Sequence, residues 1–237
     1  MARGGNRADP GHPGQASNDL CDGEKVIYSI KFKMKAFYLL IKAKRALNCY
    51  RAGEFAKMTQ ILQSVPLQDY KSYRFHNILL QITTEQNVPA LNALKELSYV
   101  SDALNYQCPE LGSVLRQLTV EKQEVDLGFV DRCLEMGCDI CEQDGNGNTV
   151  LHYAAHNNKC KLIDYLVAKD KRLIEIPTIH ERLTAIRSAA RAGQYDSVNL
   201  LRERGAQIGP LLEELIKHDR IELLECILYR PDGKMNL

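Results

Sequence analysis

Two stretches of this chain repeat one pattern, and that repetition limits the fold more than any other feature. The first, GNTVLHYAAHNNKCKLIDYLVAKD, predicts a turn, a short helix to Ala155, a loop at Asn158 and a second helix to about Ala168. Its second helix carries apolar residues at the spacing of one buried face. The second stretch, LTAIRSAARAGQYDSVNLLRERGAQI, matches it in order, with Gly193 in the place of Asn158, 35 residues later. Such a period predicts a stack of helical pairs.

The same pattern recurs on both sides in weaker form. Upstream, GFVDRCLEMGCDI fits a second helix whose first helix lies around SVLRQLTVEK, and two earlier pairs have their loops at Gly53 and Asn87. Downstream, LLEELIKHDRIELLECILYRPDG repeats the pair with a loop at Asp219, only 26 residues after Gly193. The short spacing predicts that the last unit lacks the turn that precedes the other units.

Read from Asp144, the first stretch gives D-x-x-G-x-T-x-L-H-x-A-A, which resembles the opening of an ankyrin repeat. The resemblance to the ankyrin-repeat family is clear over residues 138–208 and degenerate over the rest. It implies an all-α fold, a helical repeat solenoid with short β-hairpin loops, in which each unit packs on its neighbours. We expect residues 25–237 to form about five to six such units, clearest at 144–176 and 181–208. Residues 1–24 are poor in large apolar side chains and are expected to be a disordered tail.

The resemblance also implies where a partner protein would bind, because ankyrin proteins use their hairpin tips and the concave face of their first helices. The corresponding positions in the first clear unit are Asn146, Asn148, Val150, Tyr153, His156 and Asn157. Those in the second clear unit are Glu181, Leu183, Ala185, Ser188, Arg191 and Ala192. Our candidate binding residues among them are Asn146, Asn148, Tyr153, His156, Asn157, Glu181 and Arg191, and we expect Tyr153, His156 and Arg191 to face out of the stack. The family's turn histidine matches His152, which Arg187 replaces in the second clear unit. The connection between Ala168 and Glu181 is also about two residues longer than in a regular repeat.

A zinc finger is the alternative for the same segment. Cys138, Cys141, His152 and His156 follow the order C-x2-C then H-x3-H. Such a finger places about twelve residues between its pairs, with apolar side chains that form its small core. Here residues 142–151 number ten, and DGNGN stands where an apolar residue is needed. The repeat explains these glycines as a hairpin tip and Thr149 as a helix cap, so we favour the repeat and expect no metal.

The segment before the repeats, residues 25–51, is strongly basic. Between Glu24 and Glu54 there are eight Lys or Arg residues and no acidic residue. Within it, YSIKFKMKAF alternates apolar residues with Lys31, Lys33 and Lys35, which predicts a strand or extended segment before a helix over AFYLLIKAKRAL. One interpretation is a solvated face on a capping element. The other is a surface for an acidic partner, an anionic membrane or a nuclear import factor.

Composition narrows the function further. The net charge is +1, Trp is absent and aromatic residues make up 7%, so nucleic-acid binding is not expected from the overall charge. Apolar runs are too short to span a membrane, and eight cysteines without a secretory signal predict reduced thiols in the cytosol or nucleus.

Sequence motifs for cofactor binding or catalysis are lacking, so we expect neither enzyme activity nor a cofactor. The sequence predicts a protein-interaction adaptor. A zinc- or nucleic-acid-binding regulator, through the Cys/His cluster and the basic segment, is one alternative. A pathogen effector that captures a host protein is another.

Overall fold

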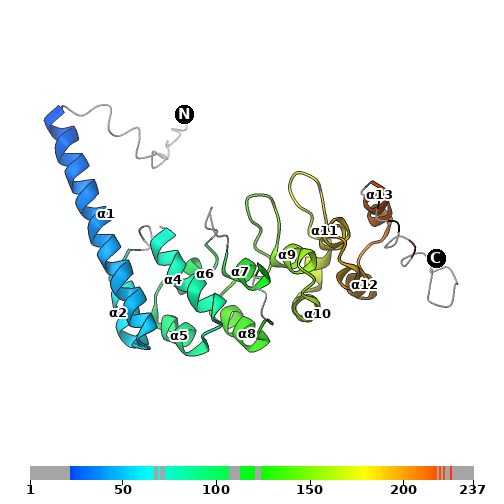
Figure 1. Ribbon diagram of the computed structural model, residues 1–237, viewed down its shortest axis with the longest axis horizontal. Helices are drawn as coiled ribbons and strands as arrows, with labels where there is room; N and C mark the ends of the chain where they lie inside the picture. The colour runs from blue at the N-terminus through cyan, green and yellow to red at the C-terminus, as the bar shows by residue number, and fades with distance from the viewer. Residues whose placement is uncertain are drawn as a thin grey trace, which may run out of the picture.

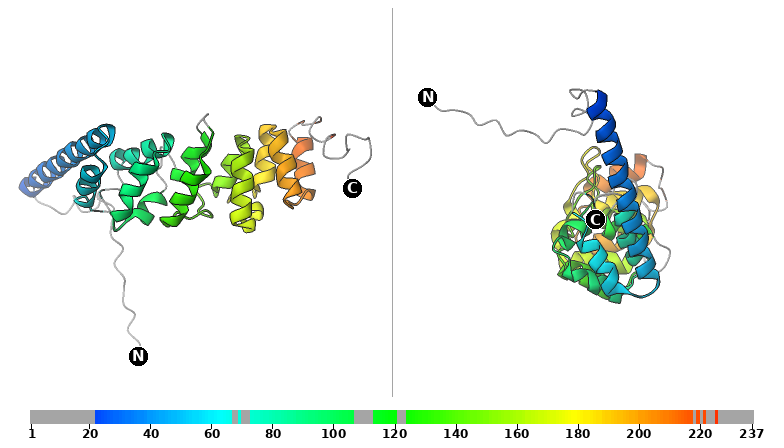
Figure 2. Two further views of the ribbon diagram at one scale, coloured as in Figure 1. Left: turned by 90° about the horizontal axis from the view of Figure 1, so that it is seen from below. Right: turned by 90° about the vertical axis from the view of Figure 1, so that its left-hand side faces the viewer.

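The chain forms an elongated row of helical pairs, as the computed structural model shows in Figures 1 and 2. The structure describes residues 22–66, 69, 73–106, 113–120, 124–217, 219, 221 and 225. Most of the predicted tail therefore lies outside the described residues, whereas residues 22–24 begin the first helix.

Five pairs follow one another along the described chain, each made of a first and a second helix. They are α1 (Asp22–Arg51) with α2 (Phe55–Gln63), α4 (Tyr73–Thr84) with α5 (Val88–Ala93), α7 (Val114–Val120) with α8 (Leu127–Glu135), α9 (Val150–His156) with α10 (Cys160–Lys169), and α11 (Ala185–Ala192) with α12 (Tyr195–Glu203). Helix α13 (Gly209–Lys217) begins a further unit, and the shorter η1 (Leu94–Glu96), α6 (Val100–Leu104) and η2 (Lys171–Glu175) lie in connections between pairs.

The turn inside most of these pairs contains one residue with left-handed backbone geometry. Gly53, Gln86, Asn158 and Gly193 have φ values of 73°, 48°, 54° and 74°. A left-handed residue ends a helix while its own N–H can still bond to the last turn. The loops predicted at Gly53, Asn158 and Gly193 are confirmed. The one predicted at Asn87 is shifted by a residue, because Asn87 instead caps α5, with its side chain accepting from the backbone N–H of Ala90.

The core runs along the whole row rather than gathering at one centre. Helices α9 and α11 pack against each other, and Ala154 and Ala155 on α9 and Ala189 and Ala190 on α11 are all fully buried. Side chains this small allow two helices to approach closely. Larger residues such as Leu151 are fully buried as well.

The connections between units differ from a regular β-hairpin. Within the described residues the structure assigns no strand. The loops are closed by turn hydrogen bonds, such as the one from the Thr178 N–H to the Leu183 carbonyl at 2.8 Å. The predicted extra length before Glu181 corresponds to η2, which buries Leu173 and Ile174. Residues 204–208 join α12 directly to α13, as the short last spacing predicts.

The predicted strand at residues 30–35 is wrong, because α1 is one continuous helix from Asp22 to Arg51. An isolated extended segment would leave its backbone N–H and C=O groups without partners in the chain, whereas a helix pairs them internally. Six alternating residues are therefore weaker evidence than the helical pattern they adjoin. Although α1 is long, neither it nor any other described helix is apolar enough to cross a membrane.

Leu151→Ala and Leu166→Ala are each expected to lower the free energy of unfolding by about 2–5 kcal/mol, as other deletions of buried leucine side chains do. Both side chains are fully buried in the α9–α10 unit, which contacts units on either side. Urea denaturation of the purified variants measures the change. Leu40→Ala on α1 is the matched control, because Leu40 is 38% exposed and its loss should cost about 0.5 kcal/mol or less. Losses below about 1 kcal/mol for both buried leucines would contradict this packing.

Candidate protein-binding groove

The loop before α9 is organised by Asp144. Its Oδ1 accepts hydrogen bonds from the backbone N–H groups of Asn146 and Asn148, both at 2.9 Å, and its Oδ2 accepts from the Tyr153 hydroxyl. Burial alone would raise the pKa of Asp144, but these hydrogen bonds outweigh it and lower the pKa. The carboxylate is therefore a fixed centre around which the loop is wrapped.

Tyr153 belongs to this framework more than to the free surface. Its side chain is half-buried, and the Arg116 guanidinium lies 4.8 Å from its ring centroid in a cation–π contact. Burial and the bond to Asp144 raise the pKa of Tyr153 to about 12. Tyr153 is therefore only partly exposed, and its participation in binding stays a prediction.

The loop before α9 and the loop before α11 are joined to each other. Both project on the same side of the row, in green and yellow in Figure 1. The Ile179 N–H donates to the Asn146 carbonyl at 3.0 Å, and Gln143 Nε2 donates to the carbonyls of Gly147 and Pro177 at 2.7 and 3.1 Å. Gly147 has φ of 84°, and a Cβ there would lie 2.5 Å from the Ile179 nitrogen. Only glycine fits this crossing of the two loops.

His152 adds a second connection between the loops from below. Its Nδ1 accepts from the Thr149 N–H at 3.1 Å, and its Nε2 lies 3.0 Å from the Leu183 carbonyl, so Nε2 carries the proton. Thr149 and His152 together form a reciprocal capping box at the start of α9. In the next unit Arg187 replaces this histidine and donates to the Arg182 carbonyl at 3.1 Å, while Thr184 makes no side-chain cap. The loop before α11 is thus held by contacts with the α9 unit as much as by contacts within its own unit.

The two joined loops and the first helices beneath them enclose a groove of about 390 Å³. It is lined by Asn146, Asn148, His156, Thr178, His180, Glu181, Leu183, Ser188 and Arg191. Five of the seven candidate residues thus gather in one place, where the Arg191 guanidinium forms an ion pair with Glu181.

The other residues expected from the family pattern lie elsewhere. Asn157 is exposed at the end of α9 but is not part of the groove lining, and neither is Tyr153. Val150 and Ala185 are buried, so their assignment to the binding surface is wrong. Each follows directly after the residue that caps its helix, and at these positions the side chain turns into the core.

Thr178 and His180 line the groove although the sequence did not single them out. They lie in the lengthened connection between Ala168 and Glu181, where alignment with a regular repeat fails. The unusual length of that connection was the only available signal.

The four residues of the zinc-finger hypothesis lie in different surroundings. Cys138 is buried, and burial raises the pKa of its thiol. Both ring nitrogens of His152 are used, as described above, and His156 is exposed in the groove. Among the described residues, no group of His, Cys, Asp or Glu side chains has the arrangement of a metal site.

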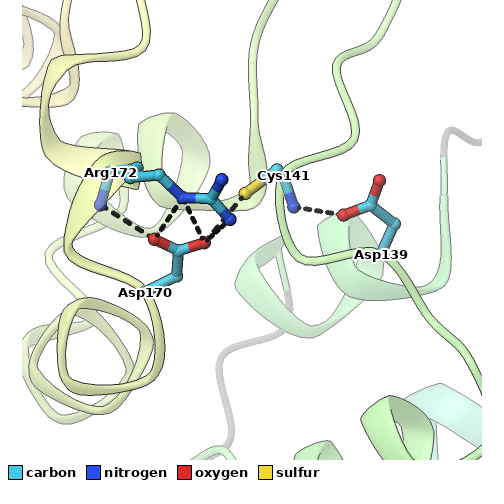
Figure 3. Close-up of polar contacts among 4 residues, drawn as sticks. All are labelled: Asp139, Cys141, Asp170 and Arg172. Atoms are coloured by element: carbon cyan, nitrogen blue, oxygen red, sulfur yellow. Dashed lines mark hydrogen bonds and ion pairs between the residues drawn. The ribbon is translucent and has the colours of Figure 1, made fainter.

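Cys141 is part of a small polar cluster that stabilises its protonated form (Figure 3). Its Sγ donates to Asp170 Oδ2 at 3.5 Å, and Arg172 Nη2 holds the same oxygen at 2.6 Å. Burial, followed by the bond to Asp170, raises the pKa of the Cys141 thiol. A thiolate, which zinc binding or nucleophilic chemistry requires, is therefore disfavoured here.

Residues 119–210 match the family model for ankyrin repeats, in three copies. The matched part runs from the end of α7 to the start of α13 and includes the whole groove. Residues 119–210 thus consist of ankyrin repeats, with an all-α solenoid fold. The helical pairs of residues 22–118 extend the same arrangement beyond the matched part (Figure 2).

The contribution of His152 to stability, through its hydrogen bond to the Leu183 carbonyl, is expected to weaken in acid. Burial is the main cause that lowers the pKa of His152 below its ordinary value of 6.5. As the pH falls below about 6.5, the unfolded chain takes up the proton first, so stability is complete above this pH and declines below it. Urea denaturation between pH 8 and pH 5 should show that the free energy of unfolding falls more steeply for the native protein than for His152→Asn. Equal pH dependence of the two proteins would contradict the assignment.

The protein is also expected to bind no stoichiometric zinc. Elemental analysis after purification without chelators is the measurement, because a structural site would retain its metal. Cys141→Ser and His156→Ala are suitable comparisons, since neither residue is in the core. One zinc per chain that these substitutions remove would restore the zinc hypothesis.

Proposed function

We propose that this protein is a non-enzymatic adaptor that binds an extended, polar segment of a partner protein in the groove between its two joined loops. Ankyrin repeats generally mediate protein–protein interaction, and the family match covers the groove. The observation that carries the proposal is that the side chains that hold the loops differ from those that line the groove. Asp144, Gln143 and His152 hold the loops, whereas His156, His180 and Ser188 line the groove and make none of the bonds that join the loops.

The chemistry of the lining favours a peptide backbone as the ligand. The side-chain amide of Asn146 offers a donor and an acceptor, the two functions that an extended peptide presents. The amide nitrogen of Asn148 already donates to Asp144, at 3.4 and 3.5 Å from its two oxygens, which leaves the Asn148 amide oxygen as an acceptor. Leu183, which is 8% exposed, provides a small apolar floor. The Arg191–Glu181 ion pair gives the groove one positive and one negative group, so it suits a mixed or polar segment better than an apolar one.

The cellular setting proposed for this adaptor is the cytosol or the nucleus. Cys49, Cys133, Cys138, Cys141 and Cys160 are free thiols in the described residues. Free thiols are typical of proteins in reducing compartments. An effector that captures a host protein would use the same groove, and the source of the captured partner would distinguish it from an endogenous adaptor.

The double substitution His156→Ala/His180→Ala is expected to weaken partner capture at least tenfold, or about 1.4 kcal/mol of binding free energy. Both side chains are exposed groove residues that the fold does not need, so thermal stability should stay within about 1 kcal/mol. The protein is used as bait in cell lysate, captured proteins are quantified by mass spectrometry, and the strongest is purified for titration.

The matched control is Lys171→Ala/Glu203→Ala, which changes two exposed residues outside the groove lining. Capture that depends on the groove should survive in this control and fail in the histidine variant. The proposal is wrong if both variants retain the same partners with the same affinity.

A further inference from the structure

Helix α1 carries an apolar stripe on the face directed away from the helical stack. Ile30, Met34, Phe37 and Ile41 are 52%, 67%, 64% and 42% exposed. Their spacing of four, three and four residues places them within about 60° of one another around the helix. Exposed apolar surface of this extent is unusual on a protein that functions alone, and it marks a contact site. We call these four residues the α1 seam.

The opposite face of α1 is buried against neighbouring helices of the same chain. Ala43, Ala46 and Tyr50 are buried in the contact of α1 with α2 and α4. These residues lie roughly 180° from the seam around the helix. The N-terminal half of α1 extends beyond the row of pairs, as the left view of Figure 2 shows. The seam is therefore reachable along its whole length while the helix stays anchored at its other end.

The seam has the register of a coiled coil. If Ile30 and Phe37 are d positions, Met34 and Ile41 are a positions. The flanking e and g positions then include Lys31, Lys33 and Arg45, all of which are exposed. In a coiled coil, charges at these positions determine the choice of partner. The other e and g positions of this stretch are Tyr38 and Leu40, and between Glu24 and Glu54 the chain has no acidic residue, so every charge on the flanks of the seam is positive.

We propose that the α1 seam binds an amphipathic helix of a different protein, with apolar residues at its a and d positions and acidic residues on the flanks. Charge complementarity favours this occupant, because Lys31, Lys33 and Arg45 on the flanks have no acidic residue among positions 25–53 to neutralise them.

This surface refines the expected role of Lys31, Lys33 and Lys35. Lys35 forms an ion pair with Asp69 at 2.8 Å and lies on the side of a recess of about 450 Å³ lined by Phe32 and Leu39. Lys31 and Lys33 flank the seam on either side. Arg45 therefore joins Lys31 and Lys33 in the basic flanks, and Lys35 does not.

The test uses two synthetic helical peptides with Leu and Ile at the a and d positions. One has Glu at every e and g position, and the other has Lys there. Fluorescence anisotropy with the full chain should show at least tenfold tighter binding of the Glu peptide, which weakens as salt rises because the flanking charges are screened. Equal binding of the two peptides, or no binding of the Glu peptide, would overturn the proposal.

Two variants separate the seam from other causes. Ile30→Ser/Phe37→Ser should reduce binding of the Glu peptide at least tenfold, while the exposed Phe32→Ser on the array-facing side should leave it unchanged. If the double variant fails to fold by circular dichroism, Lys31→Glu/Lys33→Glu gives a second test, since it should shift the preference toward the Lys peptide. An unchanged preference would refute the charge argument.

Three further measurements distinguish the proposed partner helix from other occupants of the seam and from the groove. A seam-dependent dimer in analytical ultracentrifugation would assign the seam to a second copy instead. Flotation with phosphatidylserine vesicles that Ile30→Ser/Phe37→Ser abolishes would assign it to a membrane, and either result would overturn the proposal. His156→Ala/His180→Ala should bind the Glu peptide normally, so failure of the groove and failure of the seam are distinguishable.

Discussion

Each helical pair of this protein can bury its apolar face only against the next pair. Helices α9 and α11 pack against each other, and Ala154, Ala155, Ala189 and Ala190 on them are fully buried. A larger side chain at any of these positions would have to displace its buried surroundings. The loops above these helices depend on the same contact, since the His152 ring on α9 reaches the Leu183 carbonyl only when the units are closely packed. The groove is thus a product of the spacing between units.

Much of this arrangement could be predicted from local sequence. Glycine and asparagine at Gly53, Asn158 and Gly193 are residues that tolerate left-handed backbone, so the turn positions followed from residue type. The small residues of α9 and α11 likewise indicated close packing. The capping of α9 by Thr149 followed from its position before a helical stripe. In each of these cases the determining partner lies within a few residues or in the equivalent place of the next repeat.

The remaining features depend on partners that no local pattern reveals. Arg116 lies 37 positions before Tyr153 in the sequence, and its guanidinium lies over the Tyr153 ring. The place of His180 in the groove depends on the lengthened connection and on the bond from Ile179 to Asn146. The alternation in residues 30–35 indicated a strand because period-two patterning takes no account of neighbouring elements. The helix prevails because no other described strand is available to pair with it.

The crossing of the two loops at Gly147 has a consequence for how a ligand would be recognised. Mobile recognition loops lose conformational entropy when they close on a ligand, and ordering one backbone residue costs about 1–2 kcal/mol. Here the bonds from Ile179, Gln143 and His152 fix both loops during folding, before any ligand arrives. Recognition in such a groove is close to lock-and-key. The shape of the crossing, rather than adaptation of the loops, sets which peptide conformations are rejected.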